Sequence, residues 1–370
     1  MKKVDIITLH RVVNYGSVLQ TYALQEKIKE KGFEVEVIDY YPERLHLMGM
    51  LKRLKNKKDI LKKNLFIRFG AQCVIFPSYV QRFKMFKSFL KKYIKMTDKT
   101  YYTKEDLEKE TPKADIYCTG SDQVWNSEWN EKIEYPFFLD FVPEGKKRIS
   151  YAASFGKKTL TEKEIPETKR LIERYKYLAM RELSGVEILK QLSRNDGINV
   201  LDPTLLLNKK EWLKIASNKY SDKKYVLMYN LNRNKKIDEY VKKLAKEKNL
   251  DIYYISYNLH ECLKKGKMKC NVKVEDFLSL ISNASYVVTD SFHATAFSIN
   301  FNTPFMIIFP NKFSTRLASI LEVTGLQDRI VEDHNSIELA NRTIDFSHAN
   351  EVLEKERQKA SDYLDKALNN

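Results

Sequence analysis

Residues 283–309 read NASYVVTDSFHATAFSINFNTPFMIIF, and this stretch decides the fold. The apolar run at 286–288 predicts a short buried strand, and the mostly apolar residues 294–300 predict a helix. The polar residues between them therefore lie where the carboxyl end of a strand meets the amino end of a helix. In open α/β sheets ligands bind at such places, and the free N–H groups of a helix amino terminus favour phosphate or carboxylate.

His293 is the one imidazole within this polar segment. A titratable ring beside a ligand edge is a candidate proton donor. The alternative is a histidine that caps the helix or packs in the core, since many strand–helix turns carry polar caps.

Strand and helix patterns alternate outward from this stretch over most of the chain. Predicted strands occupy 4–9, 35–40, 116–119, 148–152, 225–229, 252–256 and 304–308, and predicted helices occupy 18–31, 163–175, 235–248, 274–281, 314–324 and 350–368. This alternation predicts an α/β protein of two Rossmann-like domains with a cleft between them. We expect an N-terminal domain at 1–200, a C-terminal domain at 201–346 and a terminal helix at 347–370.

The bulk composition is that of a globular protein, with 43% hydrophobic and 31% charged residues in 370. The amino terminus has no apolar core of a secretory signal, and no run approaches the ~18 apolar residues of a membrane span. Cys73, Cys118, Cys262 and Cys270 lack CxxC pairing, and the last two are spaced too widely for a usual zinc site with nearby His260. Reduced thiols, no metal and a cytoplasmic location are therefore expected.

The net charge of +16 is concentrated in one segment, because residues 44–99 contain 16 Lys or Arg but only two acids. We interpret it as a basic helical insertion in the first domain. Its aromatic residues, with Phe83, Phe86, Phe89 and Tyr93 at helical spacing, leave alternatives open. Basic and bulky apolar side chains together suit an anionic membrane surface. The other possibilities are a helical hairpin packed on the core and, with least support, a nucleic-acid surface.

Polar residues also follow other predicted strands. One group surrounds the start of the first helix and another follows the strand at 116–119; they comprise Asn14, Gly16, Ser17, Gln20, Ser121, Asp122, Gln123 and Trp125. A small residue lets the backbone approach a ligand, and an indole beside amides and carboxylates suits a sugar. A core tryptophan with a capping aspartate fits equally well.

Charged residues at further strand ends complete the candidate set. Arg181 can bind a phosphate or carboxylate through two hydrogen bonds, or it can form a structural ion pair with Glu182. Asp202 precedes a proline, so it is either a turn-forming residue or a base. Lys312 and Arg316 can add positive charge near His293.

Taken together, these segments resemble the polysaccharide pyruvyl transferase family. The matching pieces, in order from about residue 4 to 330, are NYGSVLQTYALQ with VEVIDYYP, TGSDQVWN, YAASFG, AMRE, LDPTLLL, and NASYVVTDSFHATAFSINFNTPF with FSTRLASILEVTGLQDR. The resemblance implies a GT-B-like fold and phosphoenolpyruvate as donor, with no metal or organic cofactor. It also implies a pyruvate ketal on two hydroxyls of one sugar, with the donor held by the C-terminal half and the acceptor by the N-terminal half.

Roles for individual residues follow from the resemblance. His293 matches the family histidine and would be the general acid, with Asp202 as the base. The donor's carboxylate and phosphate would be held by Arg181, Lys312 and Arg316, and by Ser291 with the helix amino terminus. Ser291 also marks a departure, because many members have Arg there. The eight polar residues of the first half would bind the acceptor, a sugar or polyprenyl-diphosphate-linked oligosaccharide.

Two rival functions remain open at this stage. The same architecture supports a glycosyltransferase that uses a nucleotide sugar. A non-enzymatic membrane- or nucleic-acid-binding module driven by residues 44–99 is the second. The preferred interpretation places a cytoplasmic enzyme at the inner face of the membrane. The acceptor sugar, the ketal stereochemistry and the oligomeric state leave no signal in the sequence.

Overall fold

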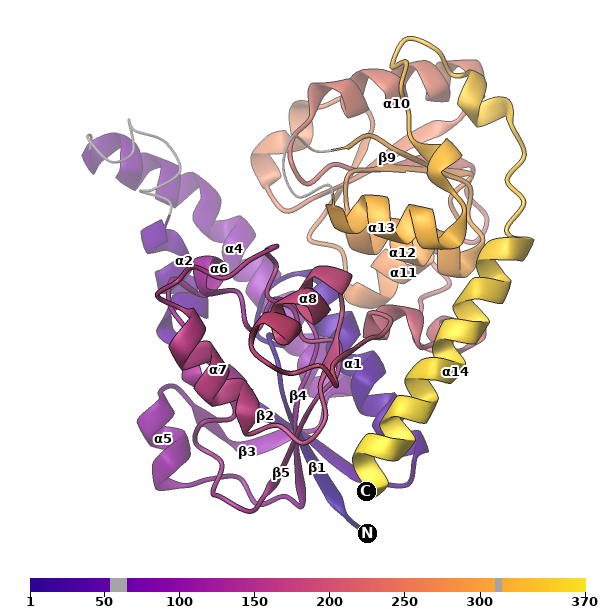
Figure 1. The fold of residues 1–370 in the computed structure, drawn as a ribbon. Coiled ribbons are helices and arrows are strands. Elements are labelled where there is room, and N and C mark those ends of the chain that lie inside the picture. Colours follow the sequence, from indigo (N-terminus) through magenta and orange to yellow (C-terminus); the bar gives the residue numbers. More distant parts are fainter. Residues whose placement is uncertain (54–64, 310–314) are drawn as a thin grey trace. The chain divides into compact units, whose positions relative to one another are not determined.

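The computed structural model describes residues 1–53, 65–309 and 315–370, and they form two α/β units (Figure 1). Unit 1 comprises Met1–Gly49, Ser88–Leu206 and Glu356–Asn370, and unit 2 comprises Met50–Lys87 and Leu207–Lys355. Each contains a five-stranded sheet whose strand pairs are all parallel. The predicted pair of Rossmann-like halves is therefore confirmed.

The sheet of unit 1 has the order β3-β2-β1-β4-β5. A two-stranded sheet, β6-β7, adjoins it through the isolated bridges Ile149–Tyr177 and Ala153–Met180. The strands are β1 (Lys3–Ile7), β2 (Glu34–Tyr40), β3 (Met96–Tyr101), β4 (Ile116–Thr119), β5 (Lys147–Ser150), β6 (Ala179–Met180) and β7 (Ile198–Asn199). The helices are α1 (Tyr15–Glu30), α5 (Lys104–Lys109), α6 (Ser127–Asn130), α7 (Ile165–Glu173) and α8 (Leu183–Gln191).

The sheet of unit 2 has the order β10-β9-β8-β11-β12. Its strands are β8 (Tyr225–Tyr229), β9 (Asp251–Ser256), β10 (Lys267–Cys270), β11 (Tyr286–Thr289) and β12 (Phe305–Ile307). Its helices are α9 (Lys209–Leu213), α10 (Lys235–Glu247), α11 (Val274–Ser282), α12 (Phe292–Phe301) and α13 (Thr315–Thr324). Short 3-10 helices occur at Glu43–Leu45, Tyr135–Phe138, Pro203–Leu205, Leu259–Leu263, Gln327–Arg329 and Glu338–Asn341.

Both faces of the unit 2 sheet are covered at its centre, which explains why the central strand β8 is apolar throughout. Met228 and Val288 belong to one core cluster with Tyr240 and Leu244 of α10. On β8, Tyr229 points to the other face, where its ring contacts Phe277 of α11 at 5.6 Å between centroids. Parallel strands buried on two faces read as continuous apolar runs, as YVLMY does here.

The basic insertion contributes two helices, α2 (Leu47–Arg53) and α4 (Leu65–Tyr93), and it does not belong to the first unit alone. Residues Met50–Lys87 group with unit 2, which corrects the sequence-based assignment. The side chain of Asn271 reaches α4 at the backbone oxygen of Ser78 (3.0 Å), and Arg82 of α4 stacks on Tyr257 with 4.1 Å from its guanidinium carbon to the ring centroid. These contacts join residues 193 and 175 positions apart, which no local pattern reveals.

The aromatic residues of the insertion divide into two groups along α4. Phe86 and Phe89 are each 2% exposed, and the Phe89 ring packs edge-on against Tyr22 of α1. This half follows the core-packing alternative. By contrast, Phe66 and Phe69 near the start of α4 are 87% and 67% exposed.

The terminal helix α14 spans Ser347–Asn369, and Glu356–Asn370 belong to unit 1. Tyr363 donates its hydroxyl to the backbone oxygen of Ser150 (2.6 Å), and Arg357 donates to that of Leu205 (2.8 Å). The second segment of unit 1 ends at Leu206, six residues beyond the expected boundary at 200. Of the helices in residues 1–53, 65–309 and 315–370, none is both long and apolar enough to cross a bilayer.

Candidate functional site

The carboxyl edge of the unit 2 sheet has a topological switch point between β8 and β11. The chain leaves β8 toward β9 on one side, whereas β11 and β12 lie on the other. Ligands of open α/β sheets bind in the crevice at such a reversal. The stretch 289–295 lies on this edge, as the sequence predicted.

Asp290 joins the two loops that leave this switch point. Its carboxylate accepts hydrogen bonds from the backbone N–H groups of Leu231 (2.8 Å) and Asn232 (2.9 Å), and from the Asn232 side chain (2.9 Å). The side chain is buried, so these bonds fix the loop after β8 against the loop after β11. Sequence reasoning assigned Asp290 no role, although its place directly before the predicted site residue Ser291 was a usable signal.

Helix α12 begins at this edge with Ser291 as its N-cap. The Ser291 hydroxyl oxygen accepts from the backbone N–H of Ala294 at 3.4 Å, and the Ser291 N–H donates to the Thr289 hydroxyl at 3.0 Å. The hydroxyl hydrogen of Ser291 stays available to an acceptor group. His293 is the second residue of the helix and is half-buried, with its ring edge-on to Phe292 at 5.2 Å.

This edge favours an anion because two helices begin at it. Helices α10 and α12 both begin here, capped by Asn234 and Ser291, and each presents N–H groups and a partial positive charge. Of the two cations predicted nearby, Lys312 lies outside the described residues. Arg316 lies in the first turn of α13, and its side chain is not among those described.

The first unit has a second polar edge, at the carboxyl ends of β1, β4 and β5. Asn14 caps α1 by accepting from the Gly16 N–H at 2.9 Å, and Ser17 donates to Asp122 at 2.6 Å. Asp122 adopts a left-handed φ of 78°, which is uncommon for a residue with a side chain and is concentrated at functional sites. Most of the predicted acceptor residues therefore come together in unit 1.

Gly120 allows the end of β4 to pack closely against β1. A Cβ atom there would lie 3.1 Å from Cβ of Thr8 and 3.2 Å from Cγ2 of Ile6, which is tighter than ordinary packing. The absence of a side chain lets the end of β4 approach β1 closely.

Two predicted acceptor residues are part of the core instead. Trp125 is 2% exposed, its indole N–H donates to the backbone oxygen of Phe137 at 3.0 Å, and its ring stacks on Phe138 at 5.2 Å. Gln20 is fully buried, and its amide donates to the hydroxyl of Thr8 at 2.9 Å. Neither side chain is placed to touch a sugar: Trp125 follows the core alternative, and Gln20 is buried inside unit 1 as well. Gln123 is half-buried and Ser121 is buried.

Arg181 is surrounded by carboxylates. Its Nη1 lies 3.2 Å from Asp202 and 3.8 Å from Asp122, and its Nε donates to Glu182 at 3.1 Å. Burial works against its charge, but these carboxylates outweigh that effect and raise the pKa of the guanidinium. With three negative groups around one positive group, the arrangement disfavours an added phosphate, contrary to the sequence-based role.

Asp202 follows the turn-forming alternative rather than the base. Its carboxylate accepts from the N–H of Thr204 at 2.9 Å and from the Thr204 hydroxyl at 2.8 Å, while the other oxygen pairs with Arg181. The side chain is 1% exposed. A carboxylate so buried and so fully bonded has little capacity to accept a substrate proton.

A further buried cluster escaped sequence reasoning. Asp39, at the end of β2, accepts from His10 at 3.1 Å, from Arg11 at 2.6 Å and from Thr100 at 2.6 Å. Burial opposes ionisation of this carboxyl, but the three donors outweigh it and hold its pKa well below the usual range. The cluster ties the loop after β1 to β2 and β3.

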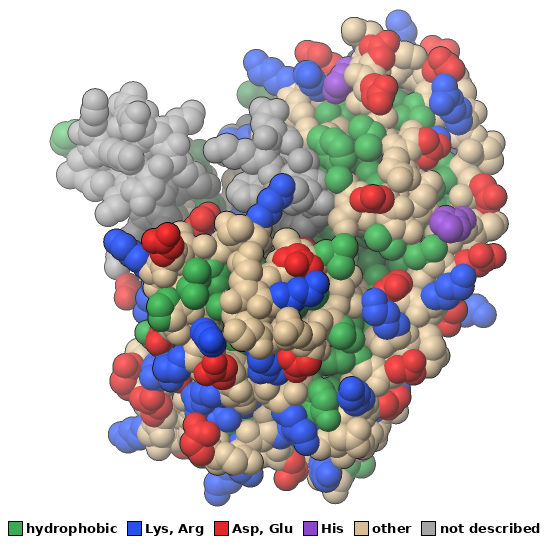
Figure 2. All heavy atoms as spheres, viewed as in Figure 1, with side chains coloured by type: hydrophobic (Ala, Val, Ile, Leu, Met, Phe, Trp, Pro, Cys, Tyr) green, Lys and Arg blue, Asp and Glu red, His purple; other side chains and the backbone are tan. Residues whose placement is uncertain are grey.

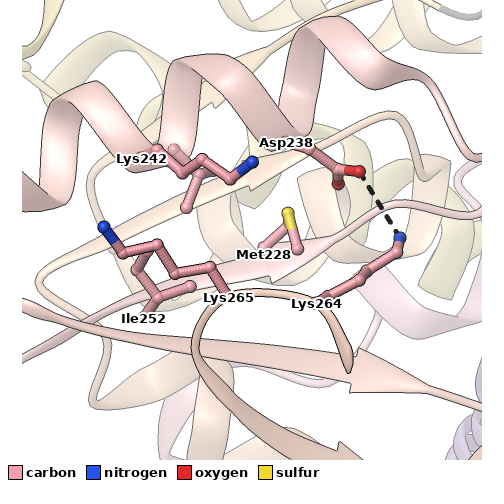
Figure 3. Close-up of a pocket in the computed structure, with 7 residues that line it drawn as sticks. Met228, Asp238, Lys242, Ile252, Lys264 and Lys265 are labelled. Carbon is pink, nitrogen blue, oxygen red and sulfur yellow. Dashed lines mark ion pairs between the residues drawn. The ribbon is translucent and has the colours of Figure 1, made fainter. Parts of the chain in front are cut away.

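A small pocket in unit 2 has a different lining from both polar edges. It lies beside α10, with a volume of about 50 Å³, over Met228 and Ile252 (Figure 3). Lys264 pairs with Asp238 at 3.5 Å on its rim, and Lys242 and Lys265 stand opposite. Sites for organic ligands usually measure several hundred Å³, so this pocket is too small to be the active site. In the described part of the chain, no group of three or more His, Cys, Asp or Glu side chains could hold a metal ion.

Comparison with protein families gives one match over most of the chain. Residues 14–310 match the family model described as polysaccharide pyruvyl transferase. This range includes both polar edges described above. No curated protein matches the sequence significantly.

Solved structures resemble the whole chain at low sequence identity. A UDP-N-acetylglucosamine 2-epimerase superposes with a TM-score of 0.54 at 11% identity, covering 100% of this chain and 95% of its own. The Methanocaldococcus jannaschii UDP-GlcNAc 2-epimerase in complex with UDP-GlcNAc and UDP gives 0.51 at 15% identity, covering 100% and 99%. At such identities the likeness establishes the fold alone, and it confirms the predicted GT-B-like architecture.

Proposed function

Because the chain belongs to the polysaccharide pyruvyl transferase family and is therefore a transferase, we propose that it transfers the pyruvate moiety of phosphoenolpyruvate to a sugar. Two hydroxyls of the sugar are bridged as a ketal, and phosphate is released. The sugar is part of a cell-surface polysaccharide or of its lipid-linked precursor. The observation that carries the proposal is the position of His293 at the amino end of α12, within the family-matched residues.

The chemistry needs one acid and a way to remove hydroxyl protons. His293 donates a proton to the methylene carbon of the donor, which leaves an oxocarbenium-like centre at the neighbouring carbon. One sugar hydroxyl attacks that carbon, and the second then displaces phosphate. Of the two protons that the hydroxyls lose, one replaces the proton given to the methyl group and the other leaves with phosphate.

Binding of the donor requires compensation of about three negative charges. The amino ends of α10 and α12 and the hydroxyl of Ser291 supply part of it. Lys312 and Arg316, expected from sequence, complete the proposed set. No metal or organic cofactor takes part in the proposed reaction.

Incubation with phosphoenolpyruvate and a panel of lipid-linked or aryl glycosides tests the proposal. The expected result is release of phosphate together with a product whose mass has gained one pyruvate ketal. His293→Asn should lower kcat at least about 100-fold while circular dichroism stays unchanged, because the amide cannot deliver the proton. The exposed His348, on α14, provides the matched control His348→Asn.

A glycosyltransferase that uses a nucleotide sugar is the rival within the same fold. A bound ligand raises the melting temperature, so a thermal-shift comparison separates the two donors. Stabilisation by UDP sugars but never by phosphoenolpyruvate would overturn the pyruvyl transferase proposal.

The proposed cytoplasmic enzyme docks on the anionic inner face of the membrane through its basic insertion. Phe66 and Phe69 of α4 are largely exposed, and the segment 44–99 has 16 basic residues against two acids. Outside the insertion, Lys and Arg are interspersed with Asp and Glu, as the lower part of Figure 2 shows. Exposed aromatic side chains together with concentrated positive charge suit anionic lipid.

A further inference from the structure

The carboxylates around Arg181 differ in the hydrogen bonds that their oxygens accept. Asp202 is 1% exposed and bonded through both oxygens, to Thr204 and to Arg181. Glu182 is 18% exposed, and its Oε1 accepts from both Arg181 (3.1 Å) and Ser154 (2.9 Å). No donor among the described residues reaches its Oε2. Among these carboxylates, Glu182 therefore has one oxygen, Oε2, that accepts no hydrogen bond from the described residues.

The local backbone explains why this carboxylate is held where it is. Glu182 occupies the N-cap position of α8, yet its side chain makes no capping bond to that helix. Short polar residues are preferred at N-caps because they satisfy the first N–H groups. Glu182 instead turns toward Ser154 at the end of β5, so its position serves the carboxyl edge of the sheet rather than the helix.

A second observation points to a ligand at the same place. The Nη2 atom of Arg181, in a side chain only 2% exposed, has no hydrogen-bond acceptor among the described residues. A buried donor without a partner costs free energy unless a water or ligand oxygen meets it. A hydroxyl can accept from such a donor and donate to a carboxylate at once, whereas an anion would be repelled by the excess negative charge.

We propose that Glu182 is the residue that binds an acceptor hydroxyl and takes its proton. The inference rests on the proposed function and specifies its acceptor side. A lone pair of the hydroxyl oxygen forms the bond to the electrophilic carbon of the donor, the O–H bond breaks with its electrons remaining on oxygen, and the proton passes to Oε2 of Glu182. Arg181 and Ser154 hold the carboxylate through Oε1.

The test is Glu182→Gln, which keeps an oxygen for Arg181 and Ser154 but cannot take the proton. We expect kcat to fall at least about 100-fold, with the phosphoenolpyruvate-induced rise in melting temperature unchanged. Glu182→Asp, which retains a carboxylate, should recover part of the turnover. The control is Glu187→Gln, on the same helix α8, where Glu187 is 61% exposed and pairs with Lys190.

Three outcomes would overturn the inference. Turnover of Glu182→Gln within a few-fold of wild type would remove the proton-accepting role. Loss of the phosphoenolpyruvate-induced stabilisation would assign the residue to the donor instead. If the wild-type protein forms no ketal, the proposed function fails separately; the hydroxyl site is then tested by glycoside-induced stabilisation, and its persistence in Glu182→Gln would exclude the site.

Discussion

At the scale of single residues, the surroundings of a side chain decide what it can do. Arg181 and Asp202 both looked like catalytic or ligand-binding residues by type, yet they bond to each other at 3.2 Å in a buried network. Glu182, first considered only as a partner for Arg181, keeps one oxygen uncommitted. The residue types identified the candidate site residues. Only their hydrogen-bond partners distinguished the structural residues from those that can react with a substrate.

Asp5 gives a pH-dependent test at this scale. It lies in the central strand β1, is fully buried and lies 3.4 Å from Lys3, and burial raises its pKa from 3.8 to about 7 despite that ion pair. The folded state therefore binds a proton more tightly than the unfolded state. The free energy of unfolding that this tighter proton binding contributes is fully present below pH 3.8, and it is lost as the pH rises to about 7.

Asp5→Asn should remove this dependence, because the amide cannot ionise. The melting temperature of the variant relative to wild type should increase from pH 4.5 to pH 8, by an amount corresponding to at most about 4 kcal/mol. Thermal unfolding of both proteins across that range measures the difference. A difference in melting temperature between variant and wild type that is the same at pH 4.5 and pH 8 would contradict the predicted titration of Asp5.

The candidate site was only partly predictable from sequence at this scale. Ser291 and His293 could be placed because a strand, a turn and a helix follow one another locally there. Trp125 could not, since its burial depends on Phe137 and Phe138, more than ten positions away. A motif identifies which residues lie at an edge, but tertiary packing decides which of them face solvent.

At the scale of elements, the central strands were predicted well, whereas two edge strands, β3 and β10, were missed. The strands 116–119 and 225–229 agree with β4 and β8 to the residue, because both are buried apolar runs. The missed strands β3 (MTDKTY) and β10 (KMKC) each stand at the edge of a sheet. Edge strands tolerate charged residues, and β3 and β10 therefore lack the apolar pattern on which the prediction depends.

Helix α4 gives the test at the element scale. Wild-type protein should float with liposomes that contain anionic lipid, and Phe66→Ser with Phe69→Ser should weaken this binding at least about tenfold, since each ring buries apolar area in the bilayer. The control is Leu263→Ser, because Leu263 is 94% exposed but lies outside the insertion.

Two results of the flotation experiment would count against membrane docking. Equal binding to neutral and anionic liposomes would remove the role of the basic residues. If the double variant instead changed the molecular mass in light scattering without affecting flotation, the exposed face of α4 would serve a second copy of the chain.

At the scale of the whole molecule, neither unit is a continuous piece of sequence. The chain passes from one unit to the other after Gly49, Lys87, Leu206 and Lys355. A length-based division at residue 200 came close to one of these positions but could not find the others. Sequence patterns place elements in order, whereas membership of a unit depends on contacts between distant segments.

The return of α14 to unit 1 predicts that this unit needs the end of the chain to be stable. Leu364 and Leu368 are 2% and 0% exposed there. Replacing such a buried leucine with a small residue costs about 2–5 kcal/mol, which is a large part of the ~5–15 kcal/mol that keeps a typical domain folded. Leu364→Ser with Leu368→Ser should therefore lower the melting temperature of the full chain markedly.

A matched control lies on the exposed face of the same helix. Gln358→Ala with Lys359→Ala changes two exposed side chains, and it should alter stability by no more than about 0.5 kcal/mol because the Lys359 ion pair with Glu356 is at the surface. Differential scanning calorimetry of both double variants measures the contrast. If the leucine variant had the same melting temperature as the control variant, the final helix would not be part of the core of unit 1. The division of the chain into these two units would then be wrong.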